Sequence, residues 1–207
     1  ARVPASPPED GEPMDRILAD FRRDILPGVT HWNHPRFFAY FPANNSYPSI
    51  LGELLSAGLG VNAMLWQTSP AATELEQRVV GWLAQLLDLP ASFQGCIQDT
   101  ASTATLTALV CARERTTGFA GNARGPAATA GLRVYASTEA HSSVIKGARL
   151  AGFGDQNIVP VGVDADRAMD PEDLARHVAA DRAAGRRPCC VVATVGTTST
   201  TAVDPLA

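Results

Sequence analysis

The chain has 207 residues, of which 45% are hydrophobic and 18% are charged, and its formal net charge is −4. This length and apolar content suffice for a sizeable core and exclude an intrinsically disordered or collagen-like chain. The acidic balance argues against a nucleic-acid partner, because surfaces that bind nucleic acids are usually basic. No apolar run approaches the roughly 18 residues that span a bilayer, so we expect no membrane segment.

The N-terminus and the cysteines indicate the compartment. Residues 1–13 are rich in Pro, Glu and Asp and lack the apolar stretch of a signal peptide. Two of the cysteines, Cys189 and Cys190, are adjacent in an apolar run that predicts a buried strand. Adjacent residues of a strand point to opposite faces, so we expect no disulfide between these two thiols. Reduced cysteines indicate a cytoplasmic protein.

The N-terminal third of the chain is predicted to be helical around an aromatic loop. Ser69 suits an N-cap, and Pro70 suits the first position of a helix that stops before Pro90. The aromatic loop, residues 31–42, has no single period, so we expect part of its rings in a core and part presented by a loop. Helices are predicted over residues 14–26, 49–59 and 70–89.

Strands and helices alternate from about residue 95 onward. Strands are predicted over residues 132–136, 158–161 and 189–194, helices over 101–115, 141–150 and 171–184, and a Gly/Ala-rich loop over 118–131. Strands joined by helices form parallel pairs, so we predict an α/β fold with a sheet covered on both faces. Ligands of such sheets bind at the carboxyl ends of the strands, which directs attention to the loops there.

Small hydroxyl residues gather where those loops meet helices. The backbone N–H groups at the start of the helix near Ala101, together with the hydroxyls of Thr100 and Ser102, suit a phosphate group. Plain capping by Asp99 or Thr100 explains the same pattern equally well. Neither a G-x-x-x-x-G-K-[ST] nor a G-x-G-x-x-G motif is present, so neither nucleotide fingerprint supports this site.

Histidines and threonines add two further candidates. His141 lies between a predicted strand and a predicted helix, where it either faces a ligand or caps the helix. The threonine-rich loop after Thr194 places hydroxyls over the same edge of the sheet. His31 and His34 have no third ligand at useful spacing, so we expect no metal site.

Taken in order, these segments resemble the group II pyridoxal-phosphate-dependent amino-acid decarboxylases, closest to the aromatic-L-amino-acid decarboxylases. The resemblance extends over residues 14–206, and several motifs in sequence order make it specific. Its carriers are HW at 31–32, FFAYFP at 37–42, Trp66, SPAATELE at 69–76, IQDTAS at 97–102, AHSS at 140–143 and VATVGTT at 192–198.

The resemblance implies a fold and a cofactor, pyridoxal 5'-phosphate. The fold is the large domain of a fold-type I PLP enzyme (aspartate-aminotransferase-like), with a mostly parallel sheet and a preceding N-terminal helical arm. Residues 1–68 correspond to the arm, which is expected to be swapped between the protomers of a homodimer, and residues 69–207 to the first part of the PLP-binding domain. The implied cofactor-binding residues are Thr100, Ala101, Ser102, His141, whose ring stacks on the pyridine and acts in catalysis, and Thr198.

The resemblance also implies a pocket for an amino-acid substrate. Asn62 and Met64 match a stretch that reaches across the dimer interface, where relatives carry larger apolar or aromatic groups. Ala43 stands where the family often has a hydroxyl residue. These departures leave open which aromatic amino acid is bound. The implied substrate-binding residues are Trp32, Tyr40, Phe41, Pro42, Ala43, Asn62 and Met64.

The implied reaction is decarboxylation of an L-amino acid to the amine and CO₂. In the family, the Schiff-base lysine, the aspartate that pairs with the pyridine nitrogen and the mobile loop with the catalytic tyrosine all follow the equivalent of Asp204. The only lysine here, Lys146, does not match the Schiff-base position, and we expect it on the surface. We therefore expect a C-terminal segment of the same protein to complete the enzyme and this chain alone to be inactive. The alternatives are a catalytically inactive binding module of the same fold and a decarboxylase for a non-aromatic amino acid.

Overall fold

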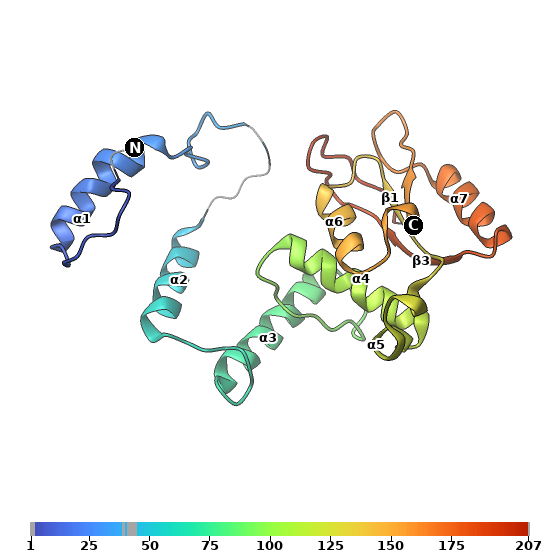
Figure 1. The fold of residues 1–207 in the computed structure, drawn as a ribbon, viewed down its shortest axis with the longest axis horizontal. Helices are drawn as coiled ribbons and strands as arrows, with labels where there is room; N and C mark the ends of the chain where they lie inside the picture. Colours follow the sequence, from blue (N-terminus) through green and yellow to red (C-terminus); the bar gives the residue numbers. More distant parts are fainter. Residues whose placement is uncertain (1–2, 39, 41–44, 207) are drawn as a thin grey trace. The chain divides into compact units, whose positions relative to one another are not determined.

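Two units divide the chain, Ala1–Leu55 and Ser56–Ala207, and each is described by itself. The computed structural model describes residues 3–38, 40 and 45–206. Figure 1 labels the helices and strands in chain order. Among the residues described, no helix is both long and apolar enough to cross a membrane.

The N-terminal helices follow the sequence pattern closely. Helix α1 comprises Met14–Asp20, and the helical path continues through a π-helical turn, Phe21–Ile25, and a 3-10 turn, Leu26–Gly28. This path confirms the helix predicted for residues 14–26. It ends where Pro27 contributes no backbone donor and Val29 adopts an extended conformation.

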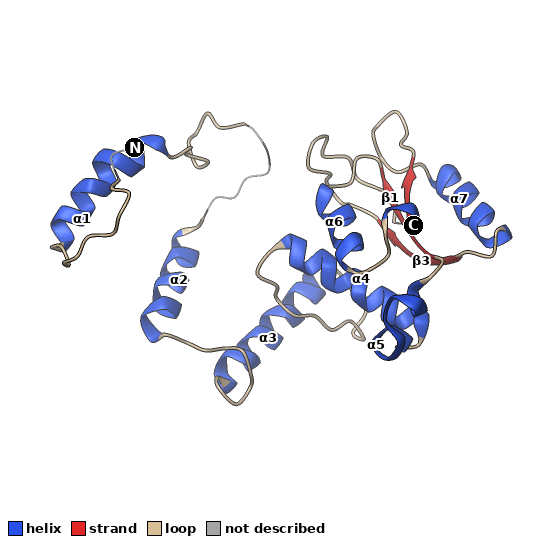
Figure 2. Cartoon of the chain, viewed as in Figure 1, coloured by secondary structure: helices blue, strands red, loops and turns tan. Residues whose placement is uncertain are grey.

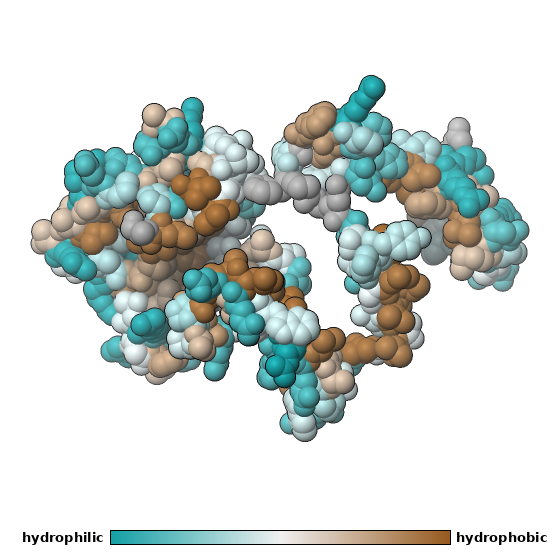
Figure 3. Space-filling model, turned by 180° about the vertical axis from the view of Figure 1, so that it is seen from behind, coloured by the Kyte–Doolittle hydropathy of each residue, from teal (hydrophilic) through white to brown (hydrophobic). Residues whose placement is uncertain are grey.

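Helix α2, Tyr47–Leu59, exposes its apolar side chains. Figure 3 shows them as a brown column along this helix. Contiguous exposed apolar side chains are typical of interaction surfaces and of ligand-binding grooves. The exposed large side chains of α2 are Tyr47, Ile50, Leu51, Leu54, Leu55 and Leu59.

Helix α3, Pro70–Leu86, begins as predicted but without the expected side-chain cap. Ser69 occupies the N-cap position, yet its hydroxyl makes no capping hydrogen bond. Pro70 at the first position needs no partner for a backbone N–H, which leaves one donor fewer to satisfy. The Glu76 carboxylate accepts a hydrogen bond of 2.7 Å from the Ile97 N–H and so ties α3 to the segment that leads into α4.

Three parallel strands form the sheet in the order β2-β1-β3 (Figure 2). Strand β1 is Leu132–Ser137, β2 is Ile158–Val161 and β3 is Arg187–Val192. The parallel sheet is confirmed. Strand β3 begins two residues before the predicted range, because the polar start of the strand pairs with Leu132 and Arg133 although it lacks an apolar pattern.

Helices cover both faces of this sheet, as predicted. On one face, α4 (Ala101–Thr117) and α6 (Ser142–Leu150) pack over a core that includes Leu109, Leu132, Val134, Ala148 and Phe153. On the other face, α7 (Pro171–Ala183) packs over Tyr135, Val159, Val161 and Met169. The side chains of β1 alternate between these two clusters, which explains why the whole strand is buried.

The Gly/Ala-rich stretch before β1 is not the plain loop that its composition indicates. It contains a short helix, α5 (Ala120–Arg124), and a 3-10 turn, Gly125–Thr129. Gly118 ends α4 in a left-handed conformation with φ +62°. Gly121 lies so close to the Glu114 carboxylate that a side chain would collide with it. The close approach at Gly121 depends on the packing of α5 against α4 and leaves no hydrophobic period in the sequence.

A β-bulge interrupts the pairing of β1 and β3. Arg133 pairs with Pro188, but Val134 pairs with Cys190, so Cys189 is an extra residue of β3. Cys189 and Cys190 both pack against the core cluster under α4 and α6. The expectation that these two side chains point to opposite faces is therefore wrong, because the bulge breaks the alternation of the strand.

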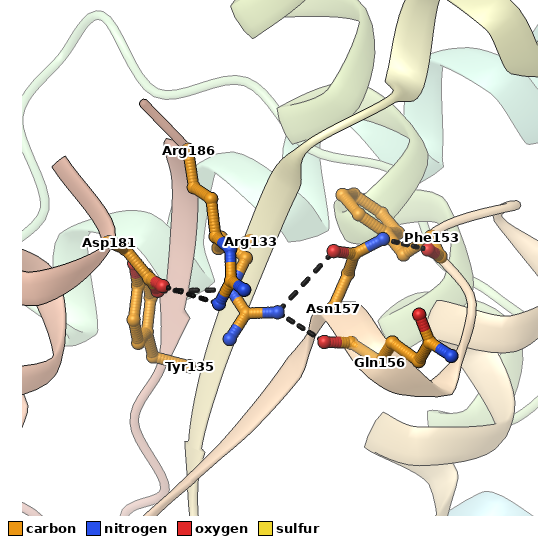
Figure 4. A network of polar contacts seen from close by, with 7 residues as sticks. All are labelled: Arg133, Tyr135, Phe153, Gln156, Asn157, Asp181 and Arg186. Carbon is orange, nitrogen blue, oxygen red and sulfur yellow. Dashed lines mark hydrogen bonds and ion pairs between the residues drawn. The ribbon is translucent and has the colours of Figure 1, made fainter. Parts of the chain in front are cut away.

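A buried polar network joins β1 to α7 (Figure 4). The Asp181 carboxylate, on α7, accepts hydrogen bonds from Arg133 Nε at 3.0 Å and from the Tyr135 hydroxyl at 2.8 Å. Arg186 donates to the second carboxylate oxygen at 3.2 Å, and Arg133 also donates to the Gln156 carbonyl oxygen. Asp181 is only 5% exposed, so its charge is neutralised by protein groups rather than by water.

Candidate active site

The carboxyl edge of the sheet brings together segments that are far apart in the sequence. Ala136 of β1 pairs with Val192 of β3, so the loops after both strands leave the sheet side by side. Figure 1 shows the loop after β3, in dark red, near α6. The start of α4 lies near the start of α6, since Ser102 and Ser143 line one cavity of about 210 Å³. The convergence predicted for these segments is thus observed for α4 and α6.

Close packing of α4 on α6 sets the position of this cavity. A Cβ atom placed on Gly147 would lie 3.1 Å from Leu109 Cδ1 and 3.5 Å from Leu106 Cα. A glycine at this position therefore lets α6 approach the backbone of α4. Lys146, beside it, is exposed as predicted and contributes to the cavity wall.

Thr100 caps the first turn of α4. Its hydroxyl oxygen accepts a hydrogen bond of 3.2 Å from the Thr103 N–H and lies 3.0 Å from the Thr103 hydroxyl. This geometry confirms the capping interpretation for Thr100. The first N–H groups of a helix have no partner within it, so Ala101 and Ser102, which are both exposed, present donors at its positive end.

Substitution of Thr100 tests this cap. We expect Thr100→Ala to lower the free energy of unfolding by about 1 kcal/mol, because the Thr103 N–H loses its acceptor. Thr100→Ser keeps the hydroxyl and should stay close to the unsubstituted protein in urea unfolding. Thr105→Ala is a matched control, because the Thr105 hydroxyl only donates to the Ala101 carbonyl oxygen within α4. An equal loss in the Ala and Ser variants of Thr100 would contradict the assignment.

His141 caps α6 through its ring. Its Nδ1 accepts a hydrogen bond of 3.2 Å from the Ser143 N–H and lies 3.0 Å from the Ser143 hydroxyl. Because Nδ1 acts as the acceptor, the neutral ring carries its proton on Nε2. The cap therefore fixes both the orientation and the tautomer of an exposed imidazole at the carboxyl edge.

A compact loop follows β3. Thr197 is fully buried, and its hydroxyl lies 2.7 Å from the Thr200 hydroxyl and accepts a hydrogen bond of 3.1 Å from the Ala202 N–H. Gly196 adopts φ +85°, which favours glycine, where the loop turns. The neighbouring Thr198 is half-buried, and among the described residues its hydroxyl has no hydrogen-bond partner. Thr197 thus shapes the loop, and Thr198 is left to present a hydroxyl.

Asp204 anchors this loop, a role that sequence reasoning missed. Its side chain is 1% exposed and accepts hydrogen bonds of 2.8 Å from both the Met169 N–H and the Thr194 N–H. Its own N–H donates to the Thr194 carbonyl oxygen at 2.9 Å. One carboxylate therefore joins the end of β3 to the segment before α7. An acid between Val203 and Pro205 is the only sequence signal, and it does not identify these partners.

We expect Asp204→Asn to lower the free energy of unfolding by about 1–3 kcal/mol. The side-chain NH₂ group of Asn would face the N–H of either Met169 or Thr194, and that N–H would lose its acceptor. Urea unfolding measures the change. Asp166→Asn, in an exposed turn, is the matched control and should have little effect. Equal midpoints for the Asp204 and Asp166 variants would show that the two backbone hydrogen bonds do not hold the loop.

The expected substrate residues fall in both units. In the first unit, the Trp32 and Tyr40 rings stack, with centroids 5.7 Å apart and an interplanar angle of 14°. In the second unit, Asn62 and Met64 are exposed, and Asn62 Oδ1 accepts a hydrogen bond of 3.2 Å from the Met64 N–H. The structure thus brings Trp32 together with Tyr40, and Asn62 together with Met64. The remaining expected residues, Phe41, Pro42 and Ala43, lie outside the described residues.

The polar groups of the second unit fit an anionic cofactor at this edge. The Ser137 hydroxyl, at the end of β1, is buried and has no hydrogen-bond partner among the described residues. The exposed N–H groups at the start of α4 add donors with partial positive charge. In the part of the chain that is described, no cluster of three or more His, Cys, Asp or Glu residues is arranged to hold a metal ion.

Comparison with known proteins identifies the class to which this fold and edge belong. The conserved domain of the pyridoxal-dependent decarboxylases matches residues 1–207. The chain therefore belongs to the pyridoxal-dependent decarboxylase family, whose cofactor is pyridoxal phosphate. This result confirms the family resemblance found in the sequence.

Individual relatives are aromatic amino-acid enzymes of plants. The chain is 45% identical over 213 residues to phenylacetaldehyde synthase of Arabidopsis thaliana, covering 99% of the chain and 43% of that protein. It is 42% identical over 215 residues to tryptophan decarboxylase 1 of Oryza sativa subsp. japonica, covering 98% of the chain and 42% of that protein. The chain thus spans less than half the length of these relatives.

Solved structures agree on the fold. The crystal structure of Oryza sativa TDC with PLP and tryptamine gives a TM-score of 0.91 at 42% identity, covering 98% of this chain and 43% of that one. The structure of Catharanthus roseus tryptophan decarboxylase in complex with L-tryptophan also gives 0.91 at 42% identity, covering 99% and 45%. These neighbours confirm the expected α/β fold of a fold-type I PLP enzyme.

Proposed function

We propose that the protein is a PLP-dependent carboxy-lyase that converts an aromatic L-amino acid to the amine and CO₂. The observation that carries this proposal is the meeting of the α4 start with the α6 start, capped by His141, at the carboxyl edge of the sheet. Identities of 42–45% with tryptophan decarboxylase 1 of Oryza sativa and phenylacetaldehyde synthase of Arabidopsis thaliana favour an aromatic substrate.

The start of α4 would hold the cofactor phosphate. Ala101 and Ser102 offer backbone N–H groups that α4 itself leaves without partners. Thr100 contributes by fixing the first turn, because its hydroxyl is already engaged with Thr103. Ser102, at the same turn, is exposed, and its hydroxyl has no hydrogen-bond partner among the described residues, so it could add a further donor.

His141 and Thr198 would position the cofactor ring and the substrate. The His141 ring, oriented by its bond with Ser143, is proposed to stack on the pyridine and to hold a proton on Nε2 near the reacting carbon. Thr198 would add a hydroxyl contact from the loop that Thr197 and Asp204 shape. When bound, pyridoxal phosphate supplies an electron sink for the electron pair released as CO₂ leaves.

The aromatic arm would line the substrate pocket in a cytoplasmic homodimer. Trp32 and Tyr40 form a stacked pair that suits an aromatic side chain and excludes water. Residues 1–68 are proposed to act as the swapped arm and residues 69–207 as part of the PLP-binding domain. The exposed apolar face of α2 is consistent with such an interface. The proposed pocket also includes Phe41, Pro42, Ala43, Asn62 and Met64.

The lysine that binds the cofactor is proposed to lie outside the 207 residues. Lys146 is exposed on α6 and caps neither site helix, and the family resemblance assigns it no catalytic part. A further segment of the same protein would then supply the reactive lysine. This chain on its own is expected to be catalytically inactive.

A second candidate function is formation of an aldehyde in place of the amine. It is favoured by the 45% identity to phenylacetaldehyde synthase of Arabidopsis thaliana. A non-catalytic binding module of the same fold and a decarboxylase for a non-aromatic amino acid remain outcomes of the same test.

The test uses the protein isolated in its natural form and saturated with pyridoxal phosphate. L-tryptophan, L-tyrosine, L-phenylalanine and L-DOPA are compared with L-glutamate and L-histidine, and CO₂, amine and aldehyde are measured separately. We expect CO₂ and the amine in equal amounts from an aromatic substrate. Aldehyde would favour the second function, turnover of glutamate or histidine alone would overturn the substrate class, and visible cofactor binding without CO₂ would favour the binding module.

A further inference from the structure

The β-bulge of β3 places two adjacent cysteines on one face of the sheet. Cys190 pairs with Val134, whose side chain belongs to the core under α4 and α6. The extra residue, Cys189, also packs on this core, and its sulfur lies 3.3 Å from the Thr116 hydroxyl of α4. In a regular strand the two thiols would point apart, and neither could share a ligand with the other.

The surroundings of the two thiols favour one thiolate. A hydrogen bond from Cys190 is the main cause that lowers the pKa of Cys189 to about 6, against the opposing effect of burial, with further help from Thr116 and the charge of Arg187. The same contact with Cys189, together with burial, raises the pKa of Cys190. A thiolate held beside a thiol is the state that attacks soft electrophiles and binds thiophilic ions.

We propose that Cys189 and Cys190 form a dithiol site that chelates a thiophilic group of the trivalent arsenic class. Both side chains are half-buried, so the pair is accessible to a small reagent while the core orients it. The reaction is a substitution without oxidation or reduction. Two As–S bonds form, the two thiol protons leave, and the oxygen of an arsenoxide departs as water.

Chelation distinguishes this pair from the other cysteines of the chain. Cys96 and Cys111 are exposed single thiols, each able to form only one bond to arsenic. Once one sulfur of the pair has reacted, the second bond forms within the molecule, which is expected to slow release about 100-fold relative to a single thiol. The site has no part in the proposed decarboxylation, so its test is independent of that function.

Phenylarsine oxide is the probe. The native, reduced protein is treated with one equivalent, washed with excess 2-mercaptoethanol and analysed by intact mass and peptide mapping. We expect one phenylarsenic group, with loss of water, on the peptide that holds Cys189 and Cys190, stable to the monothiol and released by 2,3-dimercaptopropanol. The variant Cys96→Ser/Cys111→Ser should keep it, whereas Cys189→Ser or Cys190→Ser should lose it.

The unsubstituted protein provides a readout that does not depend on the folding of variants. Bound phenylarsine oxide should protect both adjacent thiols, and not Cys96 or Cys111, from alkylation by iodoacetamide in the native state. Monothiol-resistant labelling at Cys96 or Cys111, or protection seen only after denaturation, would overturn the proposal. Retention of the adduct by a folded Cys189→Ser variant would do the same.

Discussion

Asp181→Ala is expected to lower the free energy of unfolding by about 3–5 kcal/mol, because it removes the partner of a buried cation. Asp181 is the common acceptor for Arg133, Tyr135 and Arg186. The Arg133 side chain is only 10% exposed, so water cannot replace the lost carboxylate. The substitution should therefore separate α7 from β1, and urea unfolding followed by circular dichroism measures the loss.

An exposed ion pair supplies the matched control. Asp155 accepts a hydrogen bond of 2.5 Å from Arg149, with side chains 65% and 57% exposed. Because water competes at such a site, Asp155→Ala should cost less than about 1 kcal/mol. Similar losses in the two variants would mean that the Asp181 network contributes no more than a surface pair.

Acid should remove the contribution of Asp181 in the unsubstituted protein. Burial by itself raises the pKa of this carboxyl, but hydrogen bonds from Tyr135 and Arg133 and the charge of Arg133 outweigh it, so the pKa is lowered overall. A lowered folded-state pKa stabilises the fold above the unfolded value of about 3.9, and that stability is lost as the pH falls through the folded-state pKa. The difference in unfolding free energy between the protein and Asp181→Ala should therefore be constant near pH 6 and shrink below about pH 4.

The alkaline side offers a second check on the same network. Burial, together with the hydrogen bond to Asp181, raises the pKa of Tyr135 to about 12. Between its unfolded value of about 10 and this value the unfolded chain releases its proton first, so stability should fall as the pH rises. Tyr135→Phe should abolish that part of the fall, as urea midpoints across this range would show.

Local patterns predicted most elements of the fold, because their causes are local. Apolar residues at helical spacing mark the helical path over residues 14–26, Asp170 caps α7 through the Glu172 N–H, and Gly185 with φ +73° ends it. The bulge at Cys189 has a different cause, since it depends on register with β1. Periodicity within β3 alone cannot reveal an extra residue.

The residues of the candidate site also fall into two groups, those that local sequence signals predict and those that depend on distant partners. Thr100 and His141 could be placed because helix starts and strand ends are visible in the sequence, and the parallel fold brings such points to one edge. Asp204 could not be assigned, since its partners Thr194 and Met169 are 10 and 35 residues away. Thr197 and Thr198 are alike in sequence, and only burial separates the residue that shapes the loop from the residue that presents a hydroxyl.

Substitution of His141 should cause the largest loss of activity. We expect His141→Asn to lower the rate of CO₂ release by about 10²–10⁴-fold, because the ring proposed to orient the cofactor and hold a proton is removed. Asn is also a good N-cap, so the Ser143 N–H keeps an acceptor and the stability of α6 should change by only a few tenths of a kcal/mol. Three quantities are measured for the variant and for the unsubstituted protein: the rate of CO₂ release, the absorbance of bound cofactor and the midpoint of urea unfolding.

Comparison with His141→Ala separates the two roles of the ring. The Ala variant loses both ring and cap, so it should match the Asn variant in activity and lie about 1 kcal/mol below it in stability. His177→Ala is the control, since this ring lies on α7, 3.5 Å from Asp173 and away from the site helices, and its activity should be unchanged. If the Asn variant instead keeps nearly full activity, His141 serves only as a cap. Another group must then supply the proton that catalysis requires.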